Sequence, residues 1–589
     1  MKLKNIFFIL VFLFLTFSLT AQNDPGWLWA KRGGSAAAFD FGYTRWDTGM
    51  ERIVDVAVDG NNNYYYLAEV GGYTFTLSDM EFETYNDIFG KRDIFVFSTD
   101  ESGNYRWSKI IGGGHNDFAS SLVVDNQDDI YVSGTISNLN GNTPVHFDTD
   151  TIMPEGTNNL GPNNKKAFLV KYNSQGDFIW LRQPEGDEIP LGKSASIVKT
   201  IIDTNNQLHN LIWFGHGTHL NGQLTVEAGT FKAVIVKYDY NGNLIDFISL
   251  NMHPEIISKY KYQMAYDANR DRYYIADTNR GTSGIMGIGD YGNDTNAFYL
   301  AAVNNQGEVL WYHQDHIREW YSVGDLKLDN GENIYFSGFF TTLYADNPNS
   351  FAGYEFDAPG GGSGIKNPFL IKLDPDGNLL WGTNPDLYSP FPGQSIVING
   401  DNVYLGLGML HNTWDDVEIT GPSGQGLVPD IQIMRFDAQT GEAQEVIDGN
   451  ATTPSQDAIM SMAMDSNGDL VVGGYFGSDL FYDTDLHIHN NAVDSDFFIA
   501  KYHTGEEMGV KNQNLQTVKI YPNPTTGVLN LQSKTNLESY QLYDLQGRIV
   551  KQGKLIDKQI DLSGVDNGLY FLRVRDQTGN VENLKVVKK

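Results

Sequence analysis

Histidines recur in this chain at spacings that metal sites can use. His209, His216 and His219 form one group, and two tighter pairs are His313 with His316 and His487 with His489. Imidazole nitrogens are zinc ligands, so such groups could hold an ion. His209, however, stands where other repeats of the chain place tyrosine, which indicates a structural role in a strand. The others fall in or near loops, and we predict no metal site.

Acidic turns are a second candidate for cation binding. Asp374-Pro375-Asp376-Gly377-Asn378 and Asp465-Ser466-Asn467-Gly468-Asp469 resemble the start of a calcium loop, but Pro385 and Phe476 stand where such a loop needs a bidentate glutamate. The same Asp/Asn/Gly cluster recurs between predicted strands, where these residues tolerate the positive φ of a hairpin turn. We therefore expect turns and no cofactor, with weak calcium binding at one or two turns as the alternative.

Known catalytic patterns fit this chain poorly. The Asp-x-Gly-x-Thr-Trp turn of sialidases is missing, and the Thr-Gly-x-x-x-Trp motif of quinoprotein dehydrogenases is approached only at Thr440-Gly441, where Glu445 replaces the tryptophan. No Gly-x-Ser-x-Gly, His-Glu-x-x-His or phosphate-binding glycine loop is present. The 73 acidic residues supply many carboxylate pairs by chance. We predict no catalytic residue, although a carboxylate-based enzyme stays open.

Tryptophans outside the repeat described below are candidates for ligand binding. Trp46 and Trp414 lie near acidic residues in irregular segments, an arrangement that suits sugar rings because these stack on aromatic faces. The alternative is that these side chains pack beneath loops. We take Trp46 and Trp414 as the candidate aromatic residues of a binding face.

An internal repeat must position these residues, and it runs through most of the chain. Short apolar strands end in Asp or Asn at intervals of 66, 78, 64, 62, 70 and 66 residues: Asp59, Asp125, Asp203, Asp267, Asp329, Asn399 and Asp465. A second strand follows each, usually with tyrosine near its start, and then a third strand such as Phe168-Leu169-Val170-Lys171-Tyr172. A fourth often carries Trp four residues after a turn Gly, as in Gly103/Trp107. Four alternating strands per unit predict the blade of a β-propeller.

The two ends of the repeat predict how the ring closes. The seventh unit stops after its third strand at residues 497–502, while an isolated fourth strand, Trp27-Leu28-Trp29-Ala30-Lys31-Arg32-Gly33-Gly34, stands near the N-terminus. We expect this strand to complete the last blade, so that no sheet edge stays open. The predicted fold is all-β, a seven-bladed β-propeller closed by an N-terminal strand and followed by a small C-terminal β-sandwich.

The repeat resembles a known family. The run from Asp117 to Asp125 leading into Ile130-Tyr131-Val132-Ser133-Gly134 is similar to the bacterial β-propeller repeat (SBBP-like) family, seen in surface proteins of the Bacteroidetes type. The resemblance covers residues 27–503. It implies the propeller fold and says little about function.

The N-terminus and the charge indicate where the protein works. Lys2 and Lys4 precede an apolar run at residues 6–19, and Leu19-Thr20-Ala21 offers a cleavage site, which predicts a signal peptide at residues 1–21. An uncleaved anchor is the alternative. We expect no membrane span after cleavage. The net charge of −32 disfavours nucleic acid as a partner, and the absence of cysteine excludes disulfides and thiolate chemistry.

The C-terminal segment differs from the repeat in charge and pattern. Residues 506–516 read as a linker, and residues 517–589 carry 11 basic and 7 acidic residues. The segment contains Tyr521-Pro522-Asn523-Pro524-Thr525-Thr526-Gly527, then Gly547-Arg548, then Gly568-Leu569-Tyr570, and ends on Lys585-Val586-Val587-Lys588-Lys589. Alternation and turn residues predict a small β-sandwich.

This segment resembles the type A C-terminal sorting domain of the type IX secretion system. The resemblance is carried by Tyr521, Pro522, Asn523, Pro524, Gly527, Gly547, Gly568, Tyr570 and Lys585. It implies export through the periplasm and across the outer membrane, contact with the secretion machinery, and removal of the domain by a sortase. Release or attachment to anionic lipopolysaccharide would follow.

These observations give a functional hypothesis and two alternatives. We expect residues 22–505 to form a monomeric surface or secreted propeller that binds a glycan or another surface polymer without catalysis. The first alternative is a polysaccharide hydrolase or lyase that uses carboxylates on the propeller face. The second is a purely structural role in the surface layer.

Overall fold

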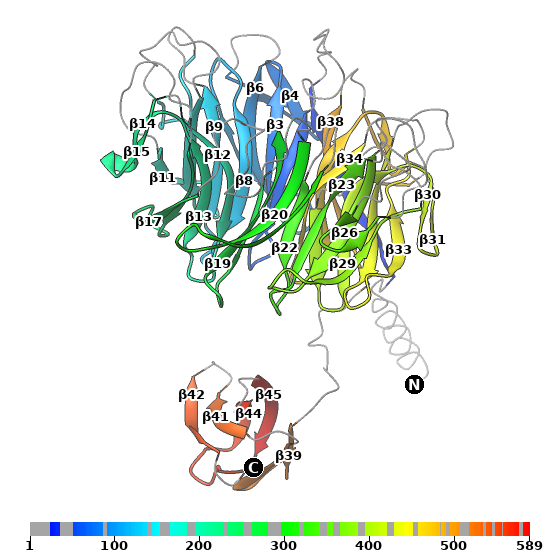
Figure 1. The fold of residues 1–589 in the computed structure, drawn as a ribbon. Coiled ribbons are helices and arrows are strands. Elements are labelled where there is room, and N and C mark those ends of the chain that lie inside the picture. Colours follow the sequence, from blue (N-terminus) through cyan, green and yellow to red (C-terminus); the bar gives the residue numbers. More distant parts are fainter. Residues whose placement is uncertain are drawn as a thin grey trace, which may run out of the picture. The chain divides into compact units, whose positions relative to one another are not determined.

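The structure is a computed structural model that carries no ligand. It describes residues 24–35, 51–85, 91–137, 143–153, 165–184, 195–228, 230, 232–250, 262–280, 296–316, 323–341, 350–356, 366–386, 395–420, 429–451, 457–482, 484–490, 495–505, 518–533, 537–544, 548–555, 558–576 and 581–589. The predicted signal peptide lies outside these residues. The chain divides into two compact units, one up to residue 506 and one from residue 507 on, and each is described by itself (Figure 1).

The first unit is built from antiparallel sheets of four strands, named sheets 1 to 7 in chain order. Sheets 1 to 3 are β2 (Arg52–Val58), β3 (Tyr64–Gly71), β6 (Arg92–Thr99) and β7 (Tyr105–Ile111); β8 (Phe118–Val124), β9 (Ile130–Ser137), β10 (Lys165–Tyr172) and β11 (Phe178–Arg182); and β12 (Ala195–Ile202), β13 (Leu208–Phe214), β16 (Lys232–Tyr238) and β17 (Leu244–Ser249).

Sheets 4 to 6 repeat this order. They are β18 (Gln263–Asp267), β19 (Arg272–Arg280), β20 (Asn296–Asn304) and β21 (Val309–His316); β22 (Val323–Leu328), β23 (Ile334–Thr341), β26 (Lys366–Leu373) and β27 (Leu379–Thr383); and β28 (Ser395–Asn399), β29 (Asn402–Met409), β32 (Asp430–Asp437) and β33 (Ala443–Asp448). Within each sheet, neighbours in the chain are neighbours in space.

Sheet 7 takes its fourth strand from the other end of the chain. Its own strands are β34 (Ala458–Met464), β35 (Leu470–Phe476) and β38 (Asp496–His503), and β1 (Gly26–Gly34) pairs with β38 from Gly26↔His503 to Gly33↔Phe497. This is the pairing that the isolated N-terminal strand predicts. Figure 1 shows the blue N-terminal strands beside the yellow strands of sheet 7.

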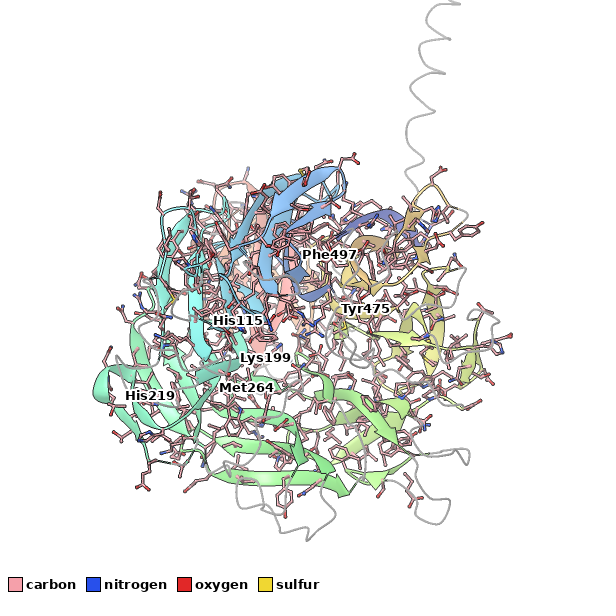
Figure 2. All side chains as sticks on the ribbon, turned by 90° about the horizontal axis from the view of Figure 1, so that it is seen from above. His115, Lys199, His219, Met264, Tyr475 and Phe497 are labelled. Atoms are coloured by element: carbon pink, nitrogen blue, oxygen red, sulfur yellow. The ribbon has the colours of Figure 1, made fainter. Side chains whose placement is uncertain are left out.

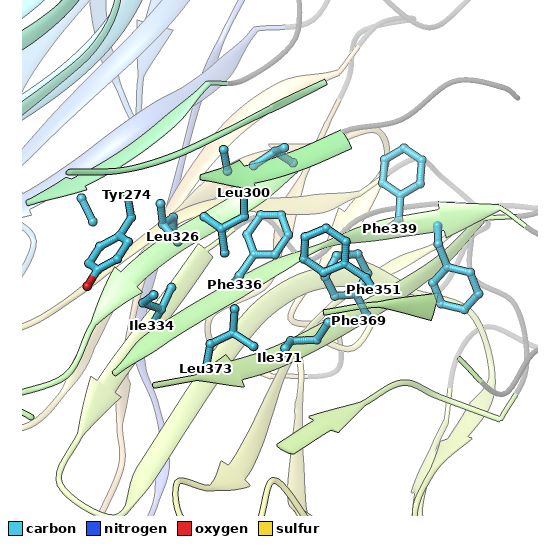
Figure 3. Packing of buried hydrophobic residues seen from close by; sticks show 14 of the residues in the cluster. Tyr274, Leu300, Leu326, Ile334, Phe336, Phe339, Phe351, Phe369, Ile371 and Leu373 are labelled. Carbon is cyan, nitrogen blue, oxygen red and sulfur yellow. The ribbon is translucent and has the colours of Figure 1, made fainter. Parts of the chain in front are cut away.

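The first strands of successive sheets lie against one another. β2 contacts β8, and the contacts continue through β12, β18, β22 and β28 to β34, which in turn contacts β2. Figure 2 shows the sheets arranged around a common centre, near which Lys199 and Met264 lie. The space between neighbouring sheets is filled by apolar side chains. Between sheets 4 and 5, for example, Tyr274 and Leu300 pack with Leu326, Phe336 and Phe369 (Figure 3).

Short hairpins are added to this framework in the connections between the second and third strands. They are β4 (Thr74–Leu77) with β5 (Met80–Glu83), which extends sheet 7; β14 (Gly217–His219) with β15 (Leu224–Val226), separated by the 3-10 turn η1 (Leu220–Gly222); β24 (Ser350–Phe351) with β25 (Tyr354–Glu355); β30 (Asn412–Trp414) with β31 (Val417–Ile419); and β36 (Asp479–Leu480) with β37 (Ile488–His489). The period-two pattern did not reveal them because each strand has only two to four residues.

The second unit consists of two sheets with one shared core. One contains β39 (Val518–Tyr521), β40 (Val528–Ser533) and β43 (Gln559–Asp561), and the other contains β41 (Leu537–Tyr543), β42 (Ile549–Lys554), β44 (Gly568–Asp576) and β45 (Val581–Lys588). Leu529 and Leu531 of the first sheet pack with Leu542, Leu572 and Val586 of the second. The unit is thus all-β, as its alternation predicts.

Candidate functional site

The two edges of the sheets in the first unit differ in their connections. Turns between first and second strands and between third and fourth strands are short, such as residues 125–129 and 374–378. Second and fourth strands end at the opposite edge, and the connections that follow them are longer, such as residues 138–164 and 342–365. We call these the short-turn edge and the long-connection edge. Loops of variable length on a rigid scaffold are where proteins usually place binding residues.

Carboxylates at the short-turn edge bond to their own turns. Asp374 Oδ1 accepts hydrogen bonds from Asp376 N at 2.9 Å and Asn378 N at 2.8 Å, and its Oδ2 accepts one from Asn378 Nδ2 at 2.8 Å. Asp465 Oδ1 accepts from Asn467 N and Asp469 N in the same way. This local bonding explains the acidic turns as hairpin devices. Of the described residues, no group of three His, Asp or Glu is placed to hold a metal ion.

The tryptophans of the repeat join neighbouring sheets at that edge. Trp107 of sheet 1 donates its Nε1 proton to Ser174 O at 3.0 Å in a turn of sheet 2, where a Cβ atom on Gly176 would lie 2.6 Å from the Trp107 ring. Trp381 donates likewise to Ala438 O at 3.1 Å. Trp29 on β1 donates to Glu101 O at 3.1 Å, which joins sheet 7 to sheet 1. These rings therefore have a structural role between neighbouring sheets.

Around the centre of the unit, in every sheet but sheet 3, the side chain at one position of the first strand forms a hydrogen bond with the backbone of the next sheet. It stands four residues before the Asp or Asn that ends the repeat's first strand. Ser121 Oγ accepts from Thr200 N at 3.0 Å, Ser395 Oγ from Met462 N at 2.9 Å, and Ser461 Oγ from Val56 N at 3.1 Å. Asp55 and Asp325 accept from Leu122 N and Ile396 N, and Gln263 Nε2 donates to Gly324 O. In sheet 3 the position is Lys199, whose ammonium group cannot accept such a bond.

The structure places Trp414, one of the two candidate tryptophans, differently from our expectation. Trp414 is fully buried, and its Nε1 donates a hydrogen bond to Thr383 Oγ1 at 2.7 Å. Trp414 therefore cannot stack on a sugar, and the prediction that it belongs to a binding face is wrong. The reason is that the β30–β31 hairpin packs the ring against Phe436, with ring centroids 5.0 Å apart. Trp46 lies outside the described residues. Exposed aromatic rings of the long connections are instead Tyr73, 52% exposed, and Tyr482, 41% exposed.

Among the residues that the structure describes, the histidines do not gather into one site. His209 is buried, and its Nδ1 is 2.7 Å from Tyr273 OH. Burial lowers the pKa of His209 to about 4, so it stays neutral at physiological pH. His219 is buried against Gly215 O at 2.8 Å, and His313 Nε2 contacts Gly377 O at 2.7 Å.

His487 and His489 lie together beside one carboxylate. Their Nε2 and Nδ1 atoms are 2.8 and 2.7 Å from Asp479 Oδ1. Burial acts to raise the pKa of Asp479, but the hydrogen bonds from His487 and His489 outweigh it and lower the pKa. This group lies in the same connection as Tyr482, whose ring meets that of His487 edge-on at 5.3 Å.

Buried carboxylates lie where sheet 7 meets sheet 1. Glu51 accepts hydrogen bonds from Ser35 N at 2.6 Å and Gly71 N at 3.0 Å, and Asp496 pairs with Arg32. Burial raises the pKa of Glu51 to about 7, with Asp496 adding repulsion. Burial also raises the pKa of Asp496 to about 6 despite Arg32. A Cβ atom on Gly34 would collide with Asp496 and lie 2.7 Å from Glu51 Oε2, so the two carboxyl groups converge there.

Residues of the C-terminal motif lie where the two ends of the second unit meet. Asn523 Nδ2 donates to Lys585 O at 2.6 Å, and Asn523 Oδ1 accepts from Val587 N at 2.8 Å. Tyr521 is 53% exposed, whereas Tyr570 is buried and donates to Asp566 O at 2.9 Å. Gly547 lies outside the described residues. Asn523 thus ties the Tyr-Pro-Asn-Pro segment to the last strand. Pro522 and Pro524 flank it in the chain, Gly527 directly precedes β40, and Gly568 begins β44 opposite Lys588.

Comparison with known proteins identifies the second unit. A family model described as a secretion system C-terminal sorting domain matches residues 519–589. Beta-agarase D of Zobellia galactanivorans is 30% identical over 97 residues, which are 16% of this chain and 20% of that protein. An uncharacterized WD repeat-containing protein of Acanthamoeba polyphaga mimivirus is 23% identical over 133 residues, 22% of this chain and 9% of that protein. The chain thus covers at most a fifth of these relatives.

Solved structures resemble the chain only weakly. Polysaccharide lyase Uly1 has a TM-score of 0.43 at 9% identity, covering 81% of this chain and 99% of the lyase. A quinohemoprotein alcohol dehydrogenase from Pseudomonas putida HK5 has a TM-score of 0.36 at 11% identity, covering 85% and 78%. Likenesses at this level do not identify an activity.

The sorting domain establishes where the protein goes. The chain carries a type IX sorting domain and is exported across the outer membrane, to be secreted or attached to the cell surface. The sorting domain implies contact with the type IX machinery. In the part of the chain that the structure describes, no helix is long and apolar enough to span a membrane.

Proposed function

We propose that residues 22–505 form a seven-bladed propeller, closed by β1, which binds a glycan or another surface polymer through the long-connection edge after residues 517–589 have directed export. The contact of β34 with β2 and the bonds from Ser461 to Val56 and from Trp29 to Glu101 support the closed ring. A sortase of the same machinery then removes the second unit.

The difference between the two edges carries this proposal. At the short-turn edge the acidic groups are used by their own turns, as in Asp374 and Asp465, and repeat tryptophans cover neighbouring turns. At the long-connection edge, added hairpins and long connections bring exposed Tyr73 and Tyr482 with the Asp479–His487–His489 group to the surface. Exposed tyrosines beside hydrogen-bonding groups suit polymers with both apolar faces and hydroxyl groups.

The test is binding of the full chain without its first 21 residues to a broad glycan and polysaccharide panel, with and without a chelator. We expect saturable binding that leaves the ligand intact. Tyr73→Ser and Tyr482→Ser should weaken it, whereas Tyr105→Ser and Tyr240→Ser, next to or in the short turns and similarly exposed at 39% and 43%, should not. Shortened products would favour the polysaccharide-degrading alternative, and no binding to any member would refute the glycan proposal.

A further inference from the structure

One face of the sheet β42-β41-β44-β45 in the second unit is exposed and basic. Side chains alternate along β44, where Leu572 and Val574 are buried and Phe571, Arg573 and Arg575 are exposed. Strand register places cross-strand neighbours on the same face in rows: Ile549–Tyr543–Phe571–Lys585, Gln552–Gln541–Arg573 and Lys554–Ser539–Arg575. We call this the basic-aromatic face.

The charges on this face have no counterpart within the described residues. No ion pair or hydrogen bond there involves the side-chain nitrogen atoms of Arg573, Arg575, Lys554 or Lys585, and none of the described side chains in the three rows is acidic. Phe571 is 47% exposed and Ile549 is 48% exposed beside them. In a chain with a net charge of −32, four basic groups around an apolar row, with no partner among the described side chains, are a local reversal of sign.

We propose that the basic-aromatic face is the surface by which a protein component of the export machinery, with an acidic and partly apolar surface, holds the sorting domain. This inference rests on the sorting role of the second unit. Unpaired positive charge calls for an acidic partner, since complementary charge sets both encounter rate and selectivity. Arginine with exposed aromatic residues is the composition of protein-interface hot spots.

The apolar row favours a protein over an anionic polysaccharide as the occupant. Sugar rings stack on flat aromatic faces, whereas aliphatic Ile549 at the end of the row offers a branched surface that fits a protein pocket. The basic-aromatic face extends across all four strands, so that Lys554 on β42 and Lys585 on β45 flank Arg573 on β44. An acidic protein surface that accepts Phe571 and Ile549 between its carboxylates matches this layout.

Export of the full chain from a bacterium with a type IX system tests the proposal. We expect Arg573→Glu with Arg575→Glu, and separately Phe571→Ser, to lower the exported fraction at least about tenfold and leave the protein in the periplasm. Lys519→Glu is the matched control, because this exposed lysine lies on β39 in the other sheet. Thermal unfolding of each purified full chain checks that folding is retained, and Arg573→Lys with Arg575→Lys should restore most export.

Further arms separate the ways in which the proposal can fail. Normal export of the Glu and Ser variants would refute the basic-aromatic face, and would leave the sorting role intact if removal of residues 519–589 still blocks export. Export of the truncated chain would refute the sorting role itself. Binding of the full chain to outer-membrane vesicles should disappear after protease treatment of the vesicles. Binding that survives protease and is lost in Arg573→Glu with Arg575→Glu would identify a polysaccharide and overturn the protein partner.

Discussion

At the scale of single residues, the repeated polar side chains of the first unit bond to backbone. Ser121, Ser395 and Ser461 each accept a backbone N–H of the next sheet, and Asp374 and Asp465 hold their own turns. A buried backbone donor left without a partner costs about 1–3 kcal/mol. These repeated polar positions are therefore explained by hydrogen bonding between sheets and within turns, with no need for a ligand.

Lys199 is the exception in this set, and it gives the first prediction. Lys199→Ser should supply the acceptor that sheet 3 lacks and raise the free energy of unfolding by about 1 kcal/mol. Ser121→Ala, which removes the acceptor of Thr200 N, should lower it by a similar amount. Denaturant unfolding of both variants checks this. A lower stability for Lys199→Ser would mean that the ammonium group has a stabilising contact of its own.

The second prediction concerns the carboxyl groups of Glu51 and Asp496. Their pKa values in the folded chain, about 7 and about 6, are raised above the ordinary values, so the folded state binds protons more tightly than the unfolded state. Stability from these groups is full below about pH 4 and is lost as the pH rises to about 7. The measurement is the free energy of unfolding between pH 5 and pH 8. Its loss over this range should be smaller in Asp496→Asn than in the parent chain by roughly 1–3 kcal/mol.

The control for that measurement is the carboxylate of an exposed side chain. Asp376 has a side chain that is 78% exposed, so Asp376→Asn should leave the pH dependence as it is in the parent chain. If Asp496→Asn and Asp376→Asn behaved alike, the decline would have to come from other buried acids such as Asp430, whose pKa burial raises to about 7.

At the scale of elements, the turn glycine and the tryptophan of the repeat act between sheets. Gly176, with φ +84°, lies under Trp107, whereas Gly222, with φ +89°, has no atom within 4 Å of a built Cβ. Both Gly176→Ala and Gly222→Ala force alanine into a left-handed backbone, at a cost of about 1 kcal/mol. Only Gly176→Ala also displaces the Trp107 ring. The free energy of unfolding of this variant, measured in denaturant, should therefore fall by about 1–3 kcal/mol more than that of Gly222→Ala. Equal losses would show that Trp107 has room to move.

Sequence reasoning reached these elements unevenly. Strand order and the pairing of residues 27–34 with the last repeat followed from spacing, because most units repeat Asp, Gly and Trp at similar offsets. Trp414 was misjudged, since the β30–β31 hairpin that buries it is too short for a periodic signal. Tyr73 and Tyr482 carry no sequence mark that separates them from the buried tyrosines of the strands. Exposure within a long connection depends on tertiary packing, which periodicity does not contain.

At the scale of the whole molecule, the stability of the first unit depends on a strand that comes from the opposite end of the chain. β1 and β38 are separated by more than 450 residues, so their pairing closes a very long loop. The chain contains no cysteine, and Ala30 and Ala500 are Cα partners on these strands. Ala30→Cys with Ala500→Cys should therefore form one disulfide and stabilise the oxidised chain by up to roughly 6 kcal/mol in the chain-entropy model.

Thiol titration and denaturant unfolding, each with and without reductant, measure this last effect. Ala30→Cys with Ala463→Cys is the matched control, because β34 is the opposite edge strand of sheet 7 and its thiol should stay free. A disulfide that forms without raising the unfolding midpoint would mean that unfolding starts elsewhere in the ring. Free thiols in the first pair would contradict the pairing of β1 with β38. If the ring is closed as proposed, detachment of β1 would open it, so the junction of β1 with β38 would limit the stability of the first unit.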